Sequence, residues 1–319
     1  MGYWTVTEAA NEWGVSERWV RMLINEGRVP GATREGRRWL IPLGSPRPTD
    51  ERAYRHLNVP EELRSGFAAV DALRDALAEH RPPTQGELER LREEFTIEYT
   101  YDSNAIEGSS LSLRETALIL DGVTIGGKPL KEHLEVVGHR DAFSYVEQLA
   151  TERPPAPITV RTIKQIHHLV LADKPEDRGA FRSLPVRIGG STHLPPDPSI
   201  VPELVDALVA GLQDNKLHPL HQATRFHLEF ESIHPFIDGN GRTGRLLLNL
   251  MLMQQGYLPI NIKYTDRKRY LDCLEAWDLG QDDEPMTKLV TNYAQQRLED
   301  WLTALRISEH IQRSRSSLP

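Results

Sequence analysis

The sequence HPFIDGNGRTGR occupies residues 234–245, and the apolar run LLLNLMLM follows it directly at residues 246–253. This order predicts a glycine-rich turn that leads into a buried helix. The first backbone N–H groups of a helix have no partners within it, and the helix dipole adds partial positive charge there. Because Gly239 and Gly241 leave the backbone open to a ligand, the start of this helix is a candidate site for a phosphate.

The charged side chains of the same stretch fit nucleotide chemistry. Arg242 and Arg245 lie three residues apart and share one helix face, which indicates an anion with more than one phosphate. Asp238 is a hard oxygen ligand suited to Mg²⁺, and His234 is the only group of the stretch that titrates near neutral pH. The residues predict nucleotide binding with general-base chemistry. The alternative is a glycine-rich surface turn with a solvated histidine and solvated arginines.

Residues 234–245 resemble the complete signature of the Fic family of AMP transferases. The resemblance implies a mainly α-helical domain that binds ATP and Mg²⁺ and transfers AMP to a Ser, Thr or Tyr hydroxyl of a protein. It implies that His234 removes the proton of that hydroxyl and that Asp238 holds Mg²⁺ between the α- and β-phosphates. The signature residues expected to bind the nucleotide are Asp238, Gly239, Asn240, Gly241, Arg242, Thr243, Gly244 and Arg245.

The segment SNAIEG at residues 103–108 is expected to end a helix, with Gly108 as its C-terminal cap. It resembles the inhibitory motif of Fic proteins, which begins here with Ser103 and carries Glu107. In that family the glutamate pairs with the second signature arginine, which implies an ion pair between Glu107 and Arg245. A carboxylate there would occupy the cation that should hold the γ-phosphate, and it would repel ATP. The alternative is an ordinary solvated glutamate.

Residues 182–196 alternate around Val186 and Ile188 and then contain a Gly-Gly and a Pro-Pro pair, which predicts a short β-hairpin. The segment resembles the flap of Fic proteins, which covers the nucleotide and holds a target segment by strand addition. The alternative is a plain surface hairpin. The residues that the resemblance brings near the nucleotide are Gly190, Ser191, Thr192 and His193.

Residues 267–278 are expected to form a helix that carries the contacts to the base and sugar of the nucleotide. Fic proteins have a Tyr-Tyr pair and a later Asn in this region. Tyr270 matches the first tyrosine, whereas Leu271 and Asp278 depart from the family at the other two positions. All three are candidate nucleotide contacts, and Tyr270 is equally compatible with the core.

Residues 1–43 predict a separate helix-turn-helix module, with helices over 6–13 and 17–26 and a small hairpin wing over 32–42. The module resembles those of excisionase-like and MerR-like regulators, so DNA is a candidate partner. The arginines that could contact DNA phosphates are Arg18, Arg21, Arg28, Arg34, Arg37 and Arg38. The alternative is a protein-docking or structural module. Nearby acidic residues dilute the positive charge, namely Glu8, Glu12, Glu17, Glu26 and Glu35.

The chain is expected to comprise five parts. They are the helix-turn-helix module at 1–43, a linker at 44–59, a helical region with the inhibitory helix at 60–125, the catalytic domain with the C-terminal helices at 126–308, and a disordered tail at 309–319. Apolar periodicity predicts helices over 63–77, 88–101, 113–120, 130–149, 160–171, 201–212, 220–233, 267–278 and 286–305.

Composition excludes several classes of protein. A net charge of −8 argues against a protein that coats nucleic acid along its whole surface. The single Cys273 excludes an internal disulfide framework and fits a reducing compartment. With no long apolar run and no signal-peptide pattern, we expect a cytoplasmic protein without a membrane partner. A zinc site of His221, His227 and His234 is disfavoured, because no His-Glu-x-x-His spacing or cysteine pair accompanies them.

Two other functions stay open at this point. Some Fic proteins with this glutamate remove AMP from their targets, which Glu107 could also support. Alternatively, the chain is a DNA-binding regulator whose Fic domain senses nucleotide, although a mere sensor would not need His234. The target protein is unknown, and self-AMPylation and homodimer formation are both compatible with the sequence.

Overall fold

The computed structural model describes residues 2–13, 15–25, 27–36, 38–45, 57, 59–79, 84–213 and 217–316, with side chains as far as Leu305. Among the residues singled out from the sequence, Glu26, Arg37 and most of the expected linker lie outside the described residues, as do residues 317–319 of the tail. The chain forms two compact units, residues 1–56 and 57–319.

The first unit combines two short helices with a small antiparallel sheet. Its elements are β1 (Tyr3–Trp4), α1 (Val6–Glu12), α2 (Glu17–Asn25), β2 (Thr33–Glu35) and β3 (Arg38–Pro42). The strands lie in the order β1-β3-β2, with Tyr3 opposite Pro42 and Thr33 opposite Leu40. Thr5 and Glu8 form the predicted capping box at the start of α1.

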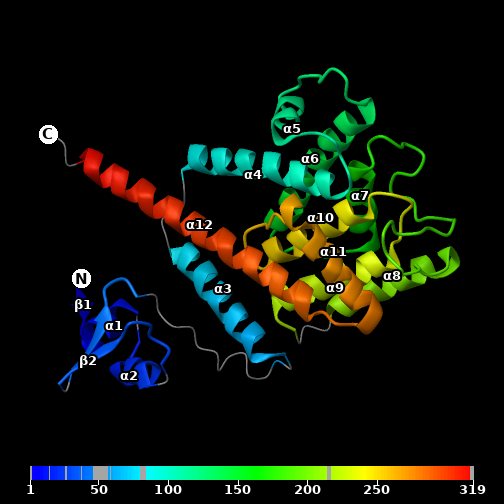
Figure 1. Ribbon diagram of the computed structural model, residues 1–319. Helices are drawn as coiled ribbons and strands as arrows, with labels where there is room; N and C mark the ends of the chain where they lie inside the picture. Colours follow the sequence, from blue (N-terminus) through cyan, green and yellow to red (C-terminus); the bar gives the residue numbers. More distant parts are fainter. Residues whose placement is uncertain are drawn as a thin grey trace. The chain divides into compact units, whose positions relative to one another are not determined.

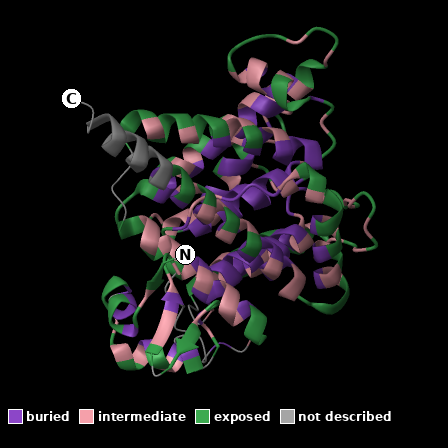
Figure 2. Cartoon of the chain, turned by 60° about the vertical axis from the view of Figure 1, so that its left-hand side comes forward, coloured by how far each residue is buried: buried purple, intermediate pink, exposed green. Residues whose placement is uncertain are grey.

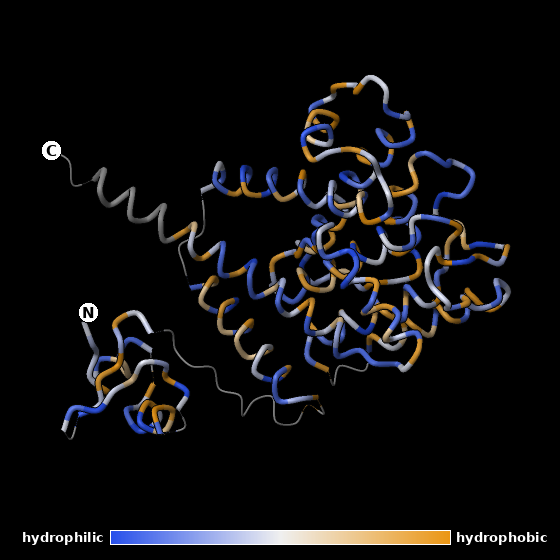
Figure 3. The backbone as a smooth tube through the Cα atoms, in the orientation of Figure 1, coloured by the Kyte–Doolittle hydropathy of each residue, from blue (hydrophilic) through white to orange (hydrophobic). Residues whose placement is uncertain are grey.

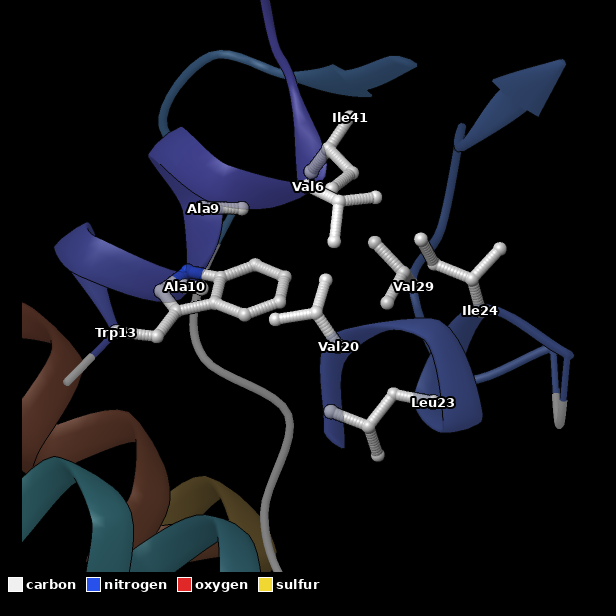
Figure 4. Close-up of a cluster of buried hydrophobic side chains, with 9 residues drawn as sticks. All are labelled: Val6, Ala9, Ala10, Trp13, Val20, Leu23, Ile24, Val29 and Ile41. Atoms are coloured by element: carbon white, nitrogen blue, oxygen red, sulfur yellow. The ribbon is translucent and has the colours of Figure 1, made fainter. Parts of the chain in front are cut away.

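The core of the first unit lies between the two helices and β3. Figure 4 shows the side chains of α1, α2 and β3 converging on one cluster, whose members are Val6, Ala9, Ala10, Trp13, Val20, Leu23, Ile24, Val29 and Ile41. Because α2 buries Val20, Leu23 and Ile24, its opposite face is exposed to solvent.

The second unit is helical, and no strand occurs in its described part. Its helices are α3 (Glu61–Glu79), α4 (Gln85–Ile106), α5 (Leu113–Leu120), α6 (Leu130–Thr151), α7 (Val160–Val170), α8 (Val201–Ala210), α9 (Pro219–Ile233), α10 (Asn240–Gln254), α11 (Arg267–Gly280) and α12 (Glu284–Ser316), with the 3₁₀ turns η2 (Pro198–Ile200), η3 (Gly211–Gln213) and η4 (Tyr264–Asp266). The predicted mainly helical fold is confirmed. No helix among the described residues is both long and apolar enough to cross a bilayer.

Helix α10 is the centre of the second unit. It packs against α6, α7 and α9, and residues 246–252 are all buried. Figure 1 shows α10 surrounded by these helices, and Figure 2 shows that buried residues concentrate in the middle of the unit. Every residue of the run 246–253 except Asn249 is apolar. All faces of the helix are therefore hydrophobic, and this explains why residues 246–252 are all buried. The core therefore fixes the position of the start of α10.

Helices α3 and α12 pack side by side. Figure 3 shows hydrophobic and hydrophilic segments alternating along α3, as expected of a helix that buries one face. Helix α12 runs to Ser316 and so extends into residues 309–316, where a disordered tail was expected. Neither glycine nor proline interrupts the sequence there, so nothing local ends the helix.

The prediction of a β-hairpin over residues 182–196 is also wrong. The segment forms an extended loop with a turn at Gly189 and Gly190, and Ser191 N–H donates to the Ile188 carbonyl at 3.2 Å. Three prolines of the segment have no N–H to donate to a strand ladder. The Arg182 guanidinium provides one of the missing hydrogen-bond donors, since it donates to the carbonyl of Pro196 at 2.6 Å.

Candidate active site

His234 is held at the end of α9 in an unusual backbone conformation. Its φ of 48° is left-handed, which turns the chain sharply into the glycine-rich stretch. Arg182 Nε donates to the His234 carbonyl at 2.8 Å, and His234 Nδ1 lies 3.3 Å from the Glu231 carbonyl oxygen. This carbonyl can only accept a proton, so Nδ1 carries the hydrogen and Nε2 keeps its lone pair. Burial lowers the pKa of His234 to about 4, which leaves the imidazole neutral at pH 7.

The start of α10 presents an uncapped row of backbone N–H groups beside this histidine. Gly239, with φ of 74°, precedes the helix and provides no side-chain cap. Helices α4, α5 and α7 each have a full capping box instead. A helix that begins without a cap keeps donors and positive dipole charge available for an anion. The backbone geometry at the start of α10 is therefore compatible with the phosphate site that the sequence predicts.

Asn240 shapes this turn rather than facing a ligand. Its side chain is 2% exposed; Oδ1 accepts from the Phe236 N–H and Nδ2 donates to the Phe236 carbonyl, both at 2.9 Å. Both polar atoms of the side chain therefore already have partners within the protein. Asn240 remains a candidate through its backbone N–H alone.

Two further signature residues point into the protein. Thr243 is fully buried, and a Cβ on Gly244 would lie 2.2 Å from Glu231 Oε1. Successive positions of a helix turn by about 100°, so the first turn can present only some of its residues to a ligand. This packing argues against direct contact of Thr243 or Gly244 with a nucleotide. Burial raises the pKa of Glu231 to about 8, so this carboxyl is mostly neutral at pH 7.

Glu107 lies against the start of α10. It follows the last residue of α4 as the C-terminal cap, and Gly108 continues with φ of 100°, as the sequence predicts for a helix end. Arg245 Nη2 donates to Glu107 Oε1 at 2.8 Å, and a Cβ on Gly241 would lie 2.2 Å from the same oxygen. The carboxylate thus lies directly against the first turn of α10, where only glycine leaves room for it.

Ser103 holds the same arginine from the preceding turn of α4. Arg245 Nε donates to Ser103 Oγ at 3.1 Å, and Nη2 donates to the Ser103 carbonyl at 2.8 Å. Arg267 Nε also donates to the Ile106 carbonyl at 2.8 Å and fixes the end of α4. The end of α4 is therefore tied to both α10 and α11.

The other two charged signature residues also have partners, which the sequence did not reveal. Arg242 Nη1 lies 3.1 Å from Glu135 Oε1 of α6, and Arg242 Nη2 lies 3.5 Å from Asp238 Oδ1. Lys174 Nζ lies 2.5 Å from Asp238 Oδ2. Although burial opposes ionisation, the hydrogen bond from Lys174 lowers the pKa of Asp238. Glu135 and Lys174 belong to no motif, and no spacing in the sequence links them to the signature.

His167 is a third residue that the motif does not include. The Gly179 N–H donates to its Nδ1 at 2.9 Å, so Nε2 carries the proton and donates to the Asp238 carbonyl at 2.9 Å. Its ring stacks on Phe236 with centroids 3.6 Å apart. Burial lowers the pKa of His167 to about 4, which preserves this neutral tautomer. His167 therefore fixes the backbone of the glycine-rich turn.

A magnesium ion fits this site only if a nucleotide brings it. Asp238 is the one signature carboxylate, and its side chain is 34% exposed. Among the described residues, no group of three or more His, Cys, Asp or Glu side chains could hold a metal ion. Mg²⁺ commonly keeps several waters and takes one or two carboxylates together with substrate phosphates. A single accessible carboxylate beside an anion site matches that pattern.

The residues expected to contact the base and sugar differ in their burial. Tyr270 is 1% exposed, with its hydroxyl 2.9 Å from His227 Nε2 and 3.5 Å from Arg245 Nη1, so it packs beneath the arginine as a core residue. Of the two roles that the sequence leaves open for Tyr270, this burial favours a place in the core. Leu271 follows it on α11 and is partly exposed.

Asp278 and His193 approach each other next to His234. His193 Nε2 donates to the Ser232 carbonyl at 2.9 Å, and His193 Nδ1 lies 3.6 Å from Asp278 Oδ1. Gly190, Ser191 and Thr192 form the partly exposed turn that precedes His193. The segment is thus pinned to α9 and α11 beside His234. His221 lies elsewhere and pairs with Asp283 at 2.8 Å.

Comparison with known proteins gives a consistent result. Residues 157–252 match the Fic/DOC family. The chain is 34% identical over 256 residues to the "Protein adenylyltransferase Fic" of Culex quinquefasciatus and 33% identical over 241 residues to that of Drosophila melanogaster. These matches cover 78% and 74% of the chain, which spans about half the length of these curated relatives, 50% and 48%.

Solved structures resemble the chain over a similar share. Fic-1 (aa134–508) from C. elegans superposes with a TM-score of 0.70 at 30% identity, covering 77% of this chain and 74% of that one. A Fic family protein from Desulfovibrio desulfuricans superposes with a TM-score of 0.66 at 25% identity, covering 78% and 76%. The similarity extends well beyond the signature itself.

Proposed function

Because the chain belongs to the Fic/DOC family, we propose that it is a protein adenylyltransferase that transfers AMP from ATP to a hydroxyl group of a protein. The main support for the proposal is that His234 lies next to the start of α10. A neutral histidine with a free Nε2 stands beside an uncapped helix start whose anion position an internal carboxylate, Glu107, now occupies. The relatives named Protein adenylyltransferase Fic support the same activity.

In this proposal, each group of the site has a separate role in binding the phosphates of ATP. The N–H groups at the start of α10 bind phosphate oxygens, and Arg245 neutralises the outer phosphates once Glu107 has withdrawn. The buried Arg242, which pairs with Glu135, contributes further positive charge near the phosphates. Asp238 would hold the divalent cation, which when bound supplies further neutralisation of the phosphates.

His234 performs the proton transfer. Its Nε2 takes the proton from a serine, threonine or tyrosine hydroxyl of the target as the oxygen attacks the α-phosphorus. The new oxygen–phosphorus bond forms as the bond to the bridging oxygen of the β-phosphate breaks, and pyrophosphate leaves. The Glu231 carbonyl keeps the reactive nitrogen aimed outward throughout.

We propose that Glu107 inhibits this reaction within the same chain. Its carboxylate is a substitute anion: it binds Arg245 at 2.8 Å and lies against Gly241, where a phosphate would otherwise lie. The glutamate side chain is 38% exposed, so a change of its rotamer is sufficient to clear the site. Relief of the inhibition therefore requires no rearrangement of the core.

The position of the label in ATP tests the reaction type. Protein labelling by ATP that carries ³²P in the α-phosphate is expected in the Glu107→Gly variant, whereas ATP with ³²P in the γ-phosphate should leave the protein unlabelled. Gel autoradiography with both nucleotides measures this directly. Transfer of the γ-label alone would show a kinase and would overturn the proposal.

For the first unit we propose that two helices and a hairpin form a DNA-binding winged helix-turn-helix. Arg18 and Arg21 lie on the exposed face of α2, and Arg34 and Arg38 lie exposed on the hairpin. One small unit thus presents four guanidinium groups from α2, β2 and β3, which suits contact with successive phosphates.

The DNA proposal predicts a salt-dependent loss on mutation. The double variant Arg18→Ala, Arg21→Ala should bind duplex DNA at least tenfold more weakly at low salt, with the salt slope reduced by about 2. Arg90→Ala is the matched control, because Arg90 pairs with Glu94 as Arg21 pairs with Glu17. Fluorescence anisotropy gives the affinities. Equal binding by all three proteins would contradict DNA contact through α2.

A further inference from the structure

Lys174 is a cation of the site that lies outside the signature. It follows α7 in the loop 171–179 and places Nζ 2.5 Å from Asp238 Oδ2. The side chains of Lys174 and Asp238 are both 34% exposed. The hydrogen bond that Lys174 donates to the Asp238 carboxylate is the largest effect and raises the pKa of Lys174 although burial opposes it, so the ammonium is charged at neutral pH.

The three cations of the site differ sharply in accessibility. The side chains of Arg242 and Arg245 are 3% and 2% exposed, and each is already paired with a carboxylate, Glu135 and Glu107 respectively. Of these three cations, Lys174 is therefore the one that a nucleotide arriving from solvent can reach first. The two arginines are rigid, buried partners, whereas lysine carries a compact charge on a flexible stem.

We propose that Lys174 is a nucleotide-binding residue. Its ammonium group pairs with Asp238 until ATP arrives and then pairs with a phosphate oxygen of the nucleotide instead. This inference rests on the proposed function, because it assumes that phosphates bind at the start of α10. The exchange keeps the charges balanced. Lys174 exchanges one oxygen anion for another when a phosphate oxygen arrives, and the carboxylate of Asp238 is then free for the divalent cation that it would hold.

The charges around Lys174 explain why the exchange is favourable. Asp173 and Asp177 lie close enough to act on Lys174 together with Asp238, so the lysine stands in a locally negative loop. Without the ammonium, Asp238 and its neighbours would face the polyphosphate directly and repel it. With the ammonium group of Lys174 present, the loop places a flexible positive charge at the edge of the site.

The test is ATP affinity without divalent metal, measured by isothermal titration calorimetry in EDTA with the Glu107→Gly variant. Adding Lys174→Met should weaken ATP binding about tenfold or more, since a charge-assisted contact is lost. Lys174→Arg should stay within about threefold, because it restores the charge. Lys288→Met is the matched control, as Lys288 is 33% exposed and pairs with Glu62 at 2.6 Å far along the chain. Thermal melting of each variant confirms that it is folded.

The outcomes separate this inference from the proposed function. Repeating the titration with saturating Mg²⁺ should shrink the loss caused by Lys174→Met, because the metal then neutralises Asp238. Unchanged ATP affinity of Lys174→Met in EDTA, or a tighter one, would overturn the role of Lys174 and leave the adenylyltransferase proposal intact. Failure of Glu107→Gly itself to bind ATP under both conditions would instead refute the proposed function.

Discussion

Replacing Glu107 with glycine is expected to raise AMP transfer by about 100-fold, because one charged contact to the transferring phosphates commonly contributes two to three orders of magnitude. The change removes the carboxylate that pairs with Arg245 at 2.8 Å and lies against Gly241. Glycine is well suited to the position, since Glu107 caps α4 rather than lying within it. Initial rates of labelling from α-³²P-ATP measure the effect.

Two further variants separate charge from structure in this prediction. Glu107→Gln keeps the size of the side chain but removes its charge, and an intermediate rate is expected. Ser103→Ala removes the hydrogen bond to Arg245 Nε and leaves the ion pair in place, so little activation is expected. Equal activation by Glu107→Gly and Ser103→Ala would show that loosening α4, rather than freeing Arg245, controls the rate.

Replacing His234 is expected to lower AMP transfer about 1000-fold while ATP affinity stays within about threefold, because a general base acts on the hydroxyl and not on the nucleotide. His234→Asn is the preferred variant. Asparagine tolerates the left-handed backbone at this position, where φ is 48°, better than alanine does. Transfer is measured by α-³²P labelling in the Glu107→Gly background, and ATP affinity by calorimetry.

His168→Asn provides the matched control for this prediction. His168 lies exposed on α7 and takes no part in the site, so its replacement should leave the rate unchanged. Retention of full activity in His234→Asn would contradict the assignment of the base. A parallel loss of ATP affinity would show instead that His234 shapes the phosphate site.

The sequence predicts the parts of this site that depend on neighbouring residues. The order of glycines, arginines and apolar residues in 234–253 predicts the turn, the uncapped start of α10 and the burial of its run, and all three are present. The pairing of Glu107 with Arg245 spans 138 residues, and its basis in the sequence was the family resemblance rather than any spacing.

Partners that are distant in the sequence could not be predicted. Lys174, Glu135 and His167 reach the signature only because α6 and α7 pack against α10. The expected β-hairpin failed for a local reason, since alternation alone does not supply the backbone donors that prolines remove. For Tyr270 the sequence left a nucleotide contact and a place in the core both open, and the residue is buried in the core.

The most direct test of inhibition by Glu107 compares three proteins with α-³²P-ATP and Mg²⁺: the unmodified chain, Glu107→Gly, and Glu107→Gly combined with His234→Asn. Each is incubated alone and with a bacterial lysate, and labelled protein is detected on a gel. We predict strong labelling by Glu107→Gly only. Equal labelling by the unmodified chain would contradict inhibition by Glu107, and labelling that persists in the double variant would contradict transfer through His234.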